Sequence, residues 1–183
     1  MKCIEDEIPF DLPKGWAWAR IKTVSVDLPY GTSKKSNSFG IVAVLRMGNL
    51  QDGEIDYSDL VYSSDEADIE KYYLLENDLL FNRTNSAEWV GKTSIYRGET
   101  PAIYAGYLIR TQYSSLLCPE YMKYFMESQL YWDQLRNGTI ATAQPNCNGK
   151  TLSKMILPLP PLAEQKRIVA KLEEILPLCE RLK

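Results

Sequence analysis

The sequence predicts an α+β fold, in which short strands and one packed helix form a domain and a second helix follows it. Three observations support this prediction. Short β-branched and aromatic runs, bounded by Gly, Asp and Asn turns, fill most of the chain. A helical segment then begins at Pro119 and ends at Asn137-Gly138. After Pro160-Pro161, apolar residues recur at intervals of four and three, which is the spacing of a coiled-coil seam.

The strands are expected where the β-branched and aromatic runs occur. The run at residues 40–45 favours a buried strand, and Asp52-Gly53 is typical of a tight turn after it. Ala105-Gly106 marks a bend within the longest run. We expect strands over residues 16–26, 40–45, 78–81, 92–96, 102–113 and 155–159. Residues 54–78 have no strong period, so loops and short helical turns are expected there.

Two helices are expected, over residues 119–136 and 162–183. The apolar seam of the second helix consists of Ile168, Leu172, Ile175, Cys179 and Leu182. Pro177 lies inside this seam and is expected to kink or interrupt the helix. We therefore expect a domain at residues 1–159 and a protruding C-terminal coiled-coil-type helix at residues 160–183, which we expect to act as a spacer or dimerisation element.

Composition argues against several classes of function. The four cysteines (Cys3, Cys118, Cys147 and Cys179) are scattered, and no histidine is present to complete a zinc site or to act as a general base. We expect free thiols, no cofactor and no bound metal. No apolar run approaches the ~20 residues of a membrane span, and the acidic start is unlike a signal peptide. A cytoplasmic location without membrane contact is expected.

Charge is unevenly distributed along the chain. The net charge is −3, whereas nucleic-acid-binding domains are usually basic. Residues 52–78, here called the acidic segment, hold ten carboxylates and one lysine, so the remainder carries 20 basic and 14 acidic residues. This segregation can leave one basic face to meet phosphates and an acidic face turned away from them.

Three polar loops contain candidate DNA-contacting side chains. The loop at residues 82–86 directly follows a strand, and Arg and Asn pair bidentately with guanine and adenine. Residues 30–38 hold two lysines and several hydroxyls, which suit phosphates, and residues 144–150 hold Gln, Lys and two Asn. Structural alternatives stay open: a capped turn at 82–86, a buried ion pair for Arg83, and a solvated surface at 30–38.

A resemblance to a known family extends over nearly the whole chain. Residues 157–172 read Leu-Pro-Leu-Pro-Pro-Leu-Ala-Glu-Gln-Lys-Arg-Ile-Val-Ala-Lys-Leu, and residues 8–18 read Ile-Pro-Phe-Asp-Leu-Pro-Lys-Gly-Trp-Ala-Trp. The first resembles the junction that ends each target-recognition domain in specificity subunits of Type I restriction-modification systems. The second is similar to the start of such a domain. The strings at residues 45–49, 81–86 and 90–93 also resemble one subgroup of this family.

The resemblance implies a curved mixed β-sheet with a packed helix, which binds double-stranded DNA and reads one half of a bipartite target. It implies that the partners are a modification (methyltransferase) subunit and a restriction subunit, and that these subunits, not this chain, perform catalysis. Members usually carry two recognition domains and two helices, whereas this chain has one of each. A second recognition domain, or a second copy in a homodimer that reads an interrupted palindrome, would pair through the C-terminal helix.

The side chains expected to contact DNA are polar residues of the three loops and of the strings that carry the resemblance. They are Thr32, Ser33, Lys34, Lys35, Arg46, Asn49, Asn82, Arg83, Thr84, Asn85, Ser86, Lys92, Gln144, Asn146, Asn148 and Lys150.

Two other functions stay open. An enzyme fragment, such as a nuclease or a fused methyltransferase recognition part, would show catalysis by the isolated chain. The sequence contains no Gly-rich phosphate loop and no Asn-Pro-Pro-Tyr-like methyl-transfer motif, which disfavours it. A protein-interaction module built on the helical seam would bind no DNA even beside its partner subunits.

Overall fold

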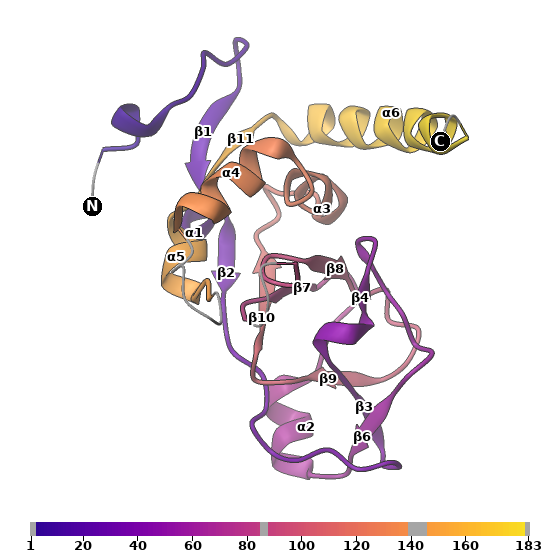
Figure 1. The fold of residues 1–183 in the computed structure, drawn as a ribbon. Helices are drawn as coiled ribbons and strands as arrows, with labels where there is room; N and C mark the ends of the chain where they lie inside the picture. The colour runs from indigo at the N-terminus through magenta and orange to yellow at the C-terminus, as the bar shows by residue number, and fades with distance from the viewer. Residues whose placement is uncertain (1–2, 85–87, 139–145, 182–183) are drawn as a thin grey trace.

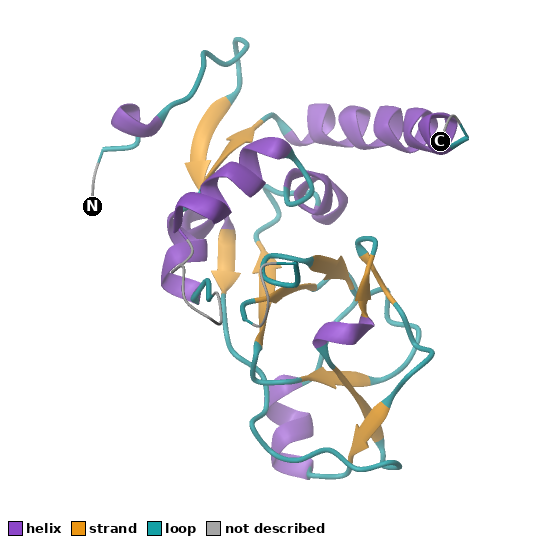
Figure 2. Ribbon diagram, viewed as in Figure 1, coloured by secondary structure: helices purple, strands orange, loops and turns teal. Residues whose placement is uncertain are grey.

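The predicted α+β fold is confirmed by a computed structural model, which describes residues 3–84, 88–138 and 146–181. In Figure 1 the molecule is elongated, with small β-sheets in its lower part and most of the helices in its upper part. Figure 2 shows the same division by secondary structure. The final helix, α6 (Leu162–Glu180), extends away from the upper part.

The strands form several small sheets. Four strands pair antiparallel in the order β2 (Ser25–Asp27), β10 (Leu108–Tyr113), β7 (Leu79–Asn82) and β8 (Thr93–Ile95). A second sheet has the order β6 (Val61–Ser63), β3 (Val42–Leu45) and β9 (Ala102–Tyr104). Since β3 pairs antiparallel with β6 and parallel with β9, the predicted mixed pairing is present. The short turn between β9 and β10 carries the chain from one sheet into the other.

Two further strand pairs complete the β structure. The β1 strand (Ala17–Arg20) pairs antiparallel with β11 (Ile156–Leu159), which joins the two ends of the domain. A short hairpin consists of β4 (Leu50–Gln51) and β5 (Glu54–Ile55). Gly53 at its turn has a φ of 77°, a backbone conformation that glycine adopts without strain.

The prediction of one continuous strand at residues 16–26 is wrong. A single helical turn, α1 (Ile21–Val24), separates β1 from β2. Both Ile21 and Val24 are buried, because residues three apart lie on the same face of a helical turn. The Ser25 hydroxyl donates a hydrogen bond to the Ile21 carbonyl at 2.7 Å, which closes the turn.

The predicted helix at residues 119–136 is two helices, α3 (Pro119–Phe125) and α4 (Gln129–Gly138). Ser128 sets the break. Its hydroxyl donates to the Phe125 carbonyl at 2.6 Å and accepts from the Tyr131 amide at 3.3 Å. This hydroxyl therefore ends one helix and caps the start of the next.

Residues 54–78, where loops and short helical turns were expected, contain a short helix but also the unexpected strands β5 and β6, and a second short helix lies near a predicted loop. In the acidic segment, α2 (Glu66–Tyr72) begins after Asp65, whose carboxylate accepts from the Asp68 amide at 2.9 Å. Near the third polar loop, α5 (Gly149–Lys154) is capped in the same way by Asn148. Two 3-10 turns, η1 (Glu5–Glu7) and η2 (Met47–Asn49), complete the described elements.

Helix α6 is anchored at its start by one buried amide side chain. Gln165 is fully buried, and its Oε1 accepts from the Cys118 amide at 2.8 Å. Its Nε2 donates to the carbonyls of Leu116 and Pro160 at 2.8 and 2.9 Å. The helix continues through Pro177 to Glu180, so the predicted interruption is absent. The missing amide of Pro177 leaves the Glu173 carbonyl on an exposed part of the helix, where water can replace the lost bond.

The described residues bury two main groups of apolar side chains. The larger lies among α1, α3, α4, α5, β7 and β11, and the smaller lies between the β3–β9 sheet and the β4 hairpin. Among the described helices, none combines the length and apolar content needed to cross a bilayer.

Replacing Gln165 with Ala should destabilise the domain. The substitution leaves one amide and two carbonyls of a buried junction without their partners and creates a cavity, so we expect a loss of about 2–4 kcal/mol in unfolding free energy. Urea denaturation followed by circular dichroism measures it. Lys166→Ala, at the neighbouring exposed position, should change stability by no more than about 0.5 kcal/mol. Equal stabilities of the two variants would contradict this role of Gln165.

Candidate DNA-binding surface

The hairpin loop between β7 and β8 is closed by backbone and side-chain bonds of Asn82. Its amide donates to the Lys92 carbonyl at 2.9 Å, and its carbonyl accepts from the Gly91 amide at 2.8 Å. Its side-chain Nδ2 donates to the carbonyls of Thr84 and Trp89 at 3.0 and 2.8 Å. These bonds give Asn82 a structural role. Because its side chain is fully buried, Asn82 is not part of the proposed DNA-binding surface.

The loop before α5 lies directly against the hairpin loop. Thr84 and Asn146 form an antiparallel bridge, and the Cys147 amide donates to the Arg83 carbonyl at 2.9 Å. The Cys147 side chain is fully buried beside this bridge, and burial raises the pKa of its thiol to about 12. Two of the three predicted loops are therefore one surface feature.

Tyr30 joins this feature from a third segment. Its hydroxyl accepts a hydrogen bond from the Gly149 amide at 3.0 Å, and its backbone bridges to Ile109 of β10. The Arg83 guanidinium carbon lies 5.0 Å from the centre of the Tyr30 ring, a cation–π contact. We call Tyr30, Arg83, Thr84, Asn146 and Lys150 the three-loop cluster.

Arg83 has no carboxylate partner among the described residues. None of the ion pairs among the described residues includes it, so the alternative of a buried ion pair finds no support in that part of the chain. Its Nε is buried and has no hydrogen-bond partner there. Lys150 is exposed on α5 and likewise forms no ion pair within the described residues. The three-loop cluster thus carries positive charge that these contacts leave uncompensated.

The remaining residues of these two loops that were predicted to contact DNA are not part of the three-loop cluster. Asn148 caps α5, with its Oδ1 accepting from the Thr151 amide at 2.9 Å, and is half-buried. Asn85, Ser86 and Gln144 lie outside the described residues.

The loop at residues 30–38 is bound to the acidic segment. Thr32 is buried, and its hydroxyl donates to the Asp68 carboxylate, so we leave it out of the proposed surface. The Lys34 ammonium lies 2.7 Å from Asp65 Oδ1 and 3.2 Å from Asp68 Oδ1. The hydrogen bond with Asp65 raises the pKa of Lys34 and lowers the pKa of Asp65. Ser33 and Lys35 remain exposed on this loop.

Arg46 and Asn49 are also engaged within the domain. Arg46 Nη2 lies 2.8 Å from Asp59 Oδ2, a second ion pair with the acidic segment. Asn49 is buried and donates to the carbonyls of Asp56 and Asp59 at 2.8 and 2.9 Å, so it too is left out. The acidic segment therefore neutralises two predicted phosphate contacts instead of simply facing away from DNA.

The family model of the Type I restriction modification DNA specificity domain matches residues 26–181. The chain belongs to this family.

Relatives of this specificity domain are subunits of Type I restriction enzymes. The present chain is 26% identical over 186 residues to the EcoAI specificity subunit of Escherichia coli, and the match covers 98% of this chain and 31% of that protein. It is 29% identical over 173 residues to the putative MjaX specificity subunit of Methanocaldococcus jannaschii, covering 90% of this chain and 40% of that protein. The chain thus spans less than half the length of these relatives.

Solved structures share the fold of this specificity domain. The HsdS subunit from Thermoanaerobacter tengcongensis matches with a TM-score of 0.71 and 23% identity, over 95% of this chain and 40% of that one. A chain from a structure on complex assembly and conformational transition of the type I R-M system matches with a TM-score of 0.76 and 22% identity. That match covers 96% of this chain and 42% of the other.

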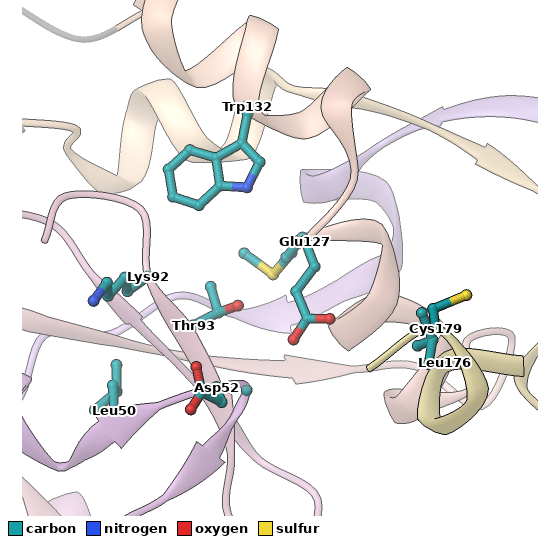
Figure 3. Close-up of a pocket in the computed structure, with 10 residues that line it drawn as sticks. Leu50, Asp52, Lys92, Thr93, Glu127, Trp132, Leu176 and Cys179 are labelled. Carbon is teal, nitrogen blue, oxygen red and sulfur yellow. The ribbon is translucent and has the colours of Figure 1, made fainter. Parts of the chain in front are cut away.

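Lys92 and Cys179 of the specificity domain line a cavity of about 430 Å³ beneath α6 (Figure 3). The Lys92 ammonium lies 4.3 Å from the centre of the Trp89 ring. The carboxylates of Asp52 and Glu127 also face this cavity, and burial raises the pKa of Glu127. The two carboxylates that line this cavity disfavour a phosphate inside it.

The predicted seam of α6 divides into two parts. Ile168 packs partly buried on the core, and Leu172 is half-buried. Ile175 and Cys179 are exposed, together with Leu178, whose exposed fraction is 53%. Leu182 lies outside the described residues. Ile168 thus packs on the domain core, Leu172 is intermediate, and the described second half of the seam presents apolar side chains to solvent.

Tyr30 is the member of the three-loop cluster that the sequence did not single out. It was the first residue of a polar loop, one of twelve tyrosines, and no local pattern marks its contacts with Arg83 and Gly149. Among the described residues, no group of His, Cys, Asp and Glu side chains has the arrangement of a metal site.

Proposed function

We propose that this specificity domain recognises one half of a bipartite sequence in double-stranded DNA through the three-loop cluster. The observation that carries the proposal is the convergence of Arg83, Asn146 and Tyr30 from three separate segments on one surface. The names of the relatives, all specificity subunits of Type I restriction enzymes, support the same function.

Each side chain of the cluster has a defined task in this proposal. Arg83 can fork onto the O6 and N7 acceptors of guanine, and Asn146 can pair with adenine in the major groove. Lys150 binds phosphate and contributes affinity without reading sequence. The exposed Ser33 and Lys35, on the loop at residues 30–38, add contacts with the phosphate backbone of DNA away from the three-loop cluster.

The proposed role is binding, and catalysis belongs to partner subunits. A modification subunit must take the target base out of the duplex to methylate it, so this domain has to hold the site in register. The absence of histidine removes the commonest general base at neutral pH, which favours this division of labour. The restriction subunit is the second proposed partner.

Replacing Arg83 with Ala should weaken binding to the target duplex by about 1–3 kcal/mol, because a bidentate base contact is lost. The target is first mapped by comparing methylation of host DNA with and without the gene, and binding is then titrated with labelled duplex. Arg167→Ala, at an exposed arginine on α6, is the matched control. Wild-type affinity in Arg83→Ala would contradict the base contact. Unfolding of Arg83→Ala would instead support a structural role.

Two lysines should differ in their effect on salt dependence. Lys150→Ala should reduce the slope of log affinity against log salt by about one, because one phosphate contact is lost. Lys34→Ala should change this slope less, because Asp65 and Asp68 already neutralise its ammonium. Titrations of both variants at several salt concentrations on one duplex measure the difference. An equal change in the two slopes would contradict the assignment of Lys150 to phosphate.

The exposed half of α6 should mediate docking to a second recognition domain, a second copy or the modification subunit. Each large aliphatic side chain left in water forgoes about 1.5–3 kcal/mol of burial, so a covering partner is expected. Ile175→Asp with Leu178→Asp should reduce sedimentation-detected self-association or binding to the modification subunit, while unfolding stays unchanged. Lys171→Asp on the same helix is the control. Assembly at wild-type strength in the double variant would rule out docking through these residues.

A further inference from the structure

We propose that Tyr30 is a positioning residue, which directs the Arg83 guanidinium so that the end of its fork meets the acceptor pair of a guanine. This inference rests on the proposed DNA-reading function and adds the residue that gives Arg83 its direction. The contact that carries it is the stack of Arg83 on the Tyr30 ring, at 5.0 Å from the guanidinium carbon to the ring centre.

The backbone of Arg83 is fixed on both sides. Its amide donates to the Tyr107 carbonyl at 3.2 Å, and its carbonyl accepts from the Cys147 amide at 2.9 Å. What remains free is the long side chain, which no carboxylate of the described residues holds. The Tyr30 ring is a described contact that restricts the direction of the guanidinium.

The ring itself is held at two points. The Tyr30 backbone bridges to Ile109 in β10, and the hydroxyl accepts from the Gly149 amide at 3.0 Å. Tyr30 is still 41% exposed, so the stack lies at the surface, where DNA can reach it. A ring fixed at both ends can orient a flexible side chain before the ligand arrives, which lowers the entropy lost on binding.

Nε of Arg83 is buried and has no hydrogen-bond partner among the described residues, so it is not open to a ligand. The two terminal nitrogens, at the end of the fork, are the edge that we assign to the ligand. A pair of parallel N–H donors matches the O6 and N7 acceptors of guanine.

An aromatic ring suits this task better than a carboxylate would. A carboxylate would orient the guanidinium by occupying its N–H donors and by neutralising its charge, and both are needed for DNA. The face of a tyrosine attracts the cation and leaves the in-plane donors free. Lys34 and Arg46 of the same domain show the other arrangement, because carboxylates pair with both of them.

Two substitutions separate the ring of Tyr30 from its hydroxyl. Tyr30→Phe keeps the ring and loses the acceptor for Gly149, whereas Tyr30→Gln keeps an acceptor and loses the ring. The whole chain, as wild type and as each variant, selects bound sequences from a duplex library with randomised base pairs. The position at which Arg83→Ala loses its guanine preference identifies the base that Arg83 reads. Binding is then compared between a selected duplex and the same duplex with 7-deazaguanine at that position.

We expect Tyr30→Gln to reduce the guanine preference at that one position about two- to fivefold, the size of an exposed cation–π contact. Tyr30→Phe should retain most of the preference, because the ring and the backbone bridge to Ile109 remain. Neither variant should change the salt slope, and Tyr30→Gln should add little on top of Arg83→Ala, because the two act through one contact. Circular dichroism melts check folding, and Tyr30→Leu replaces Tyr30→Gln if the latter is unfolded.

The possible results separate a failure of DNA recognition by the domain from a failure of the positioning role of Tyr30. A wild-type chain that selects no sequence overturns the proposed function and the inference with it. A selected guanine that Arg83→Ala loses but Tyr30→Gln retains overturns the inference alone. A uniform loss of affinity at all positions in Tyr30→Gln also overturns it, because that result indicates a merely structural tyrosine.

Discussion

The bridge between Thr84 and Asn146 is the constraint on which the candidate surface depends. It joins a hairpin loop in the first half of the chain to the loop before α5, and the Cys147 amide extends it by bonding the Arg83 carbonyl. Tyr30 then spans both loops, with its ring against Arg83 and its hydroxyl on the Gly149 amide. Because these contacts join segments that are far apart in the sequence, the surface forms only in the complete fold.

Charge is organised by pairing inside the domain. The acidic segment holds Lys34 through Asp65 and Asp68, and it holds Arg46 through Asp59. Apart from the buried Asp68 carboxylate, the charged groups of these pairs are exposed or half-buried, so the pairs with Asp65 and Asp59 contribute little to stability. Their consequence is a reduced positive charge on two loops, which leaves Arg83 and Lys150 as the cations of the three-loop cluster. A net charge of −3 is thus compatible with one locally basic surface.

Local sequence patterns predicted much of the fold and part of the candidate surface. The strands at 42–45 and 79–82 and the helix from Leu162 follow from apolar runs and from the Pro-Pro pair. The break at Ser128 was missed, because both flanking segments are helical in character and a side-chain hydroxyl decides between one helix and two. The burial of Asn49 and Asn82 was missed for a related reason: their amide groups bond backbone carbonyls that become neighbours only after folding. Tyr30 meets Gly149 across 119 positions of sequence, a separation at which no local pattern operates.

The buried Gln165 side chain at the start of α6 fixes the direction in which the helix leaves the domain. Gln165 ties the first turn to the amide of Cys118 and to two carbonyls, while the far half of the helix makes few contacts with the domain. A helix of 19 residues is about 28 Å long, so a tilt of about 10° at Gln165 displaces its tip by about 5 Å. That displacement exceeds the ~3.4 Å rise of one base pair. The hydrogen bonds of one amide side chain thus help to determine where the far end of the helix lies relative to the domain.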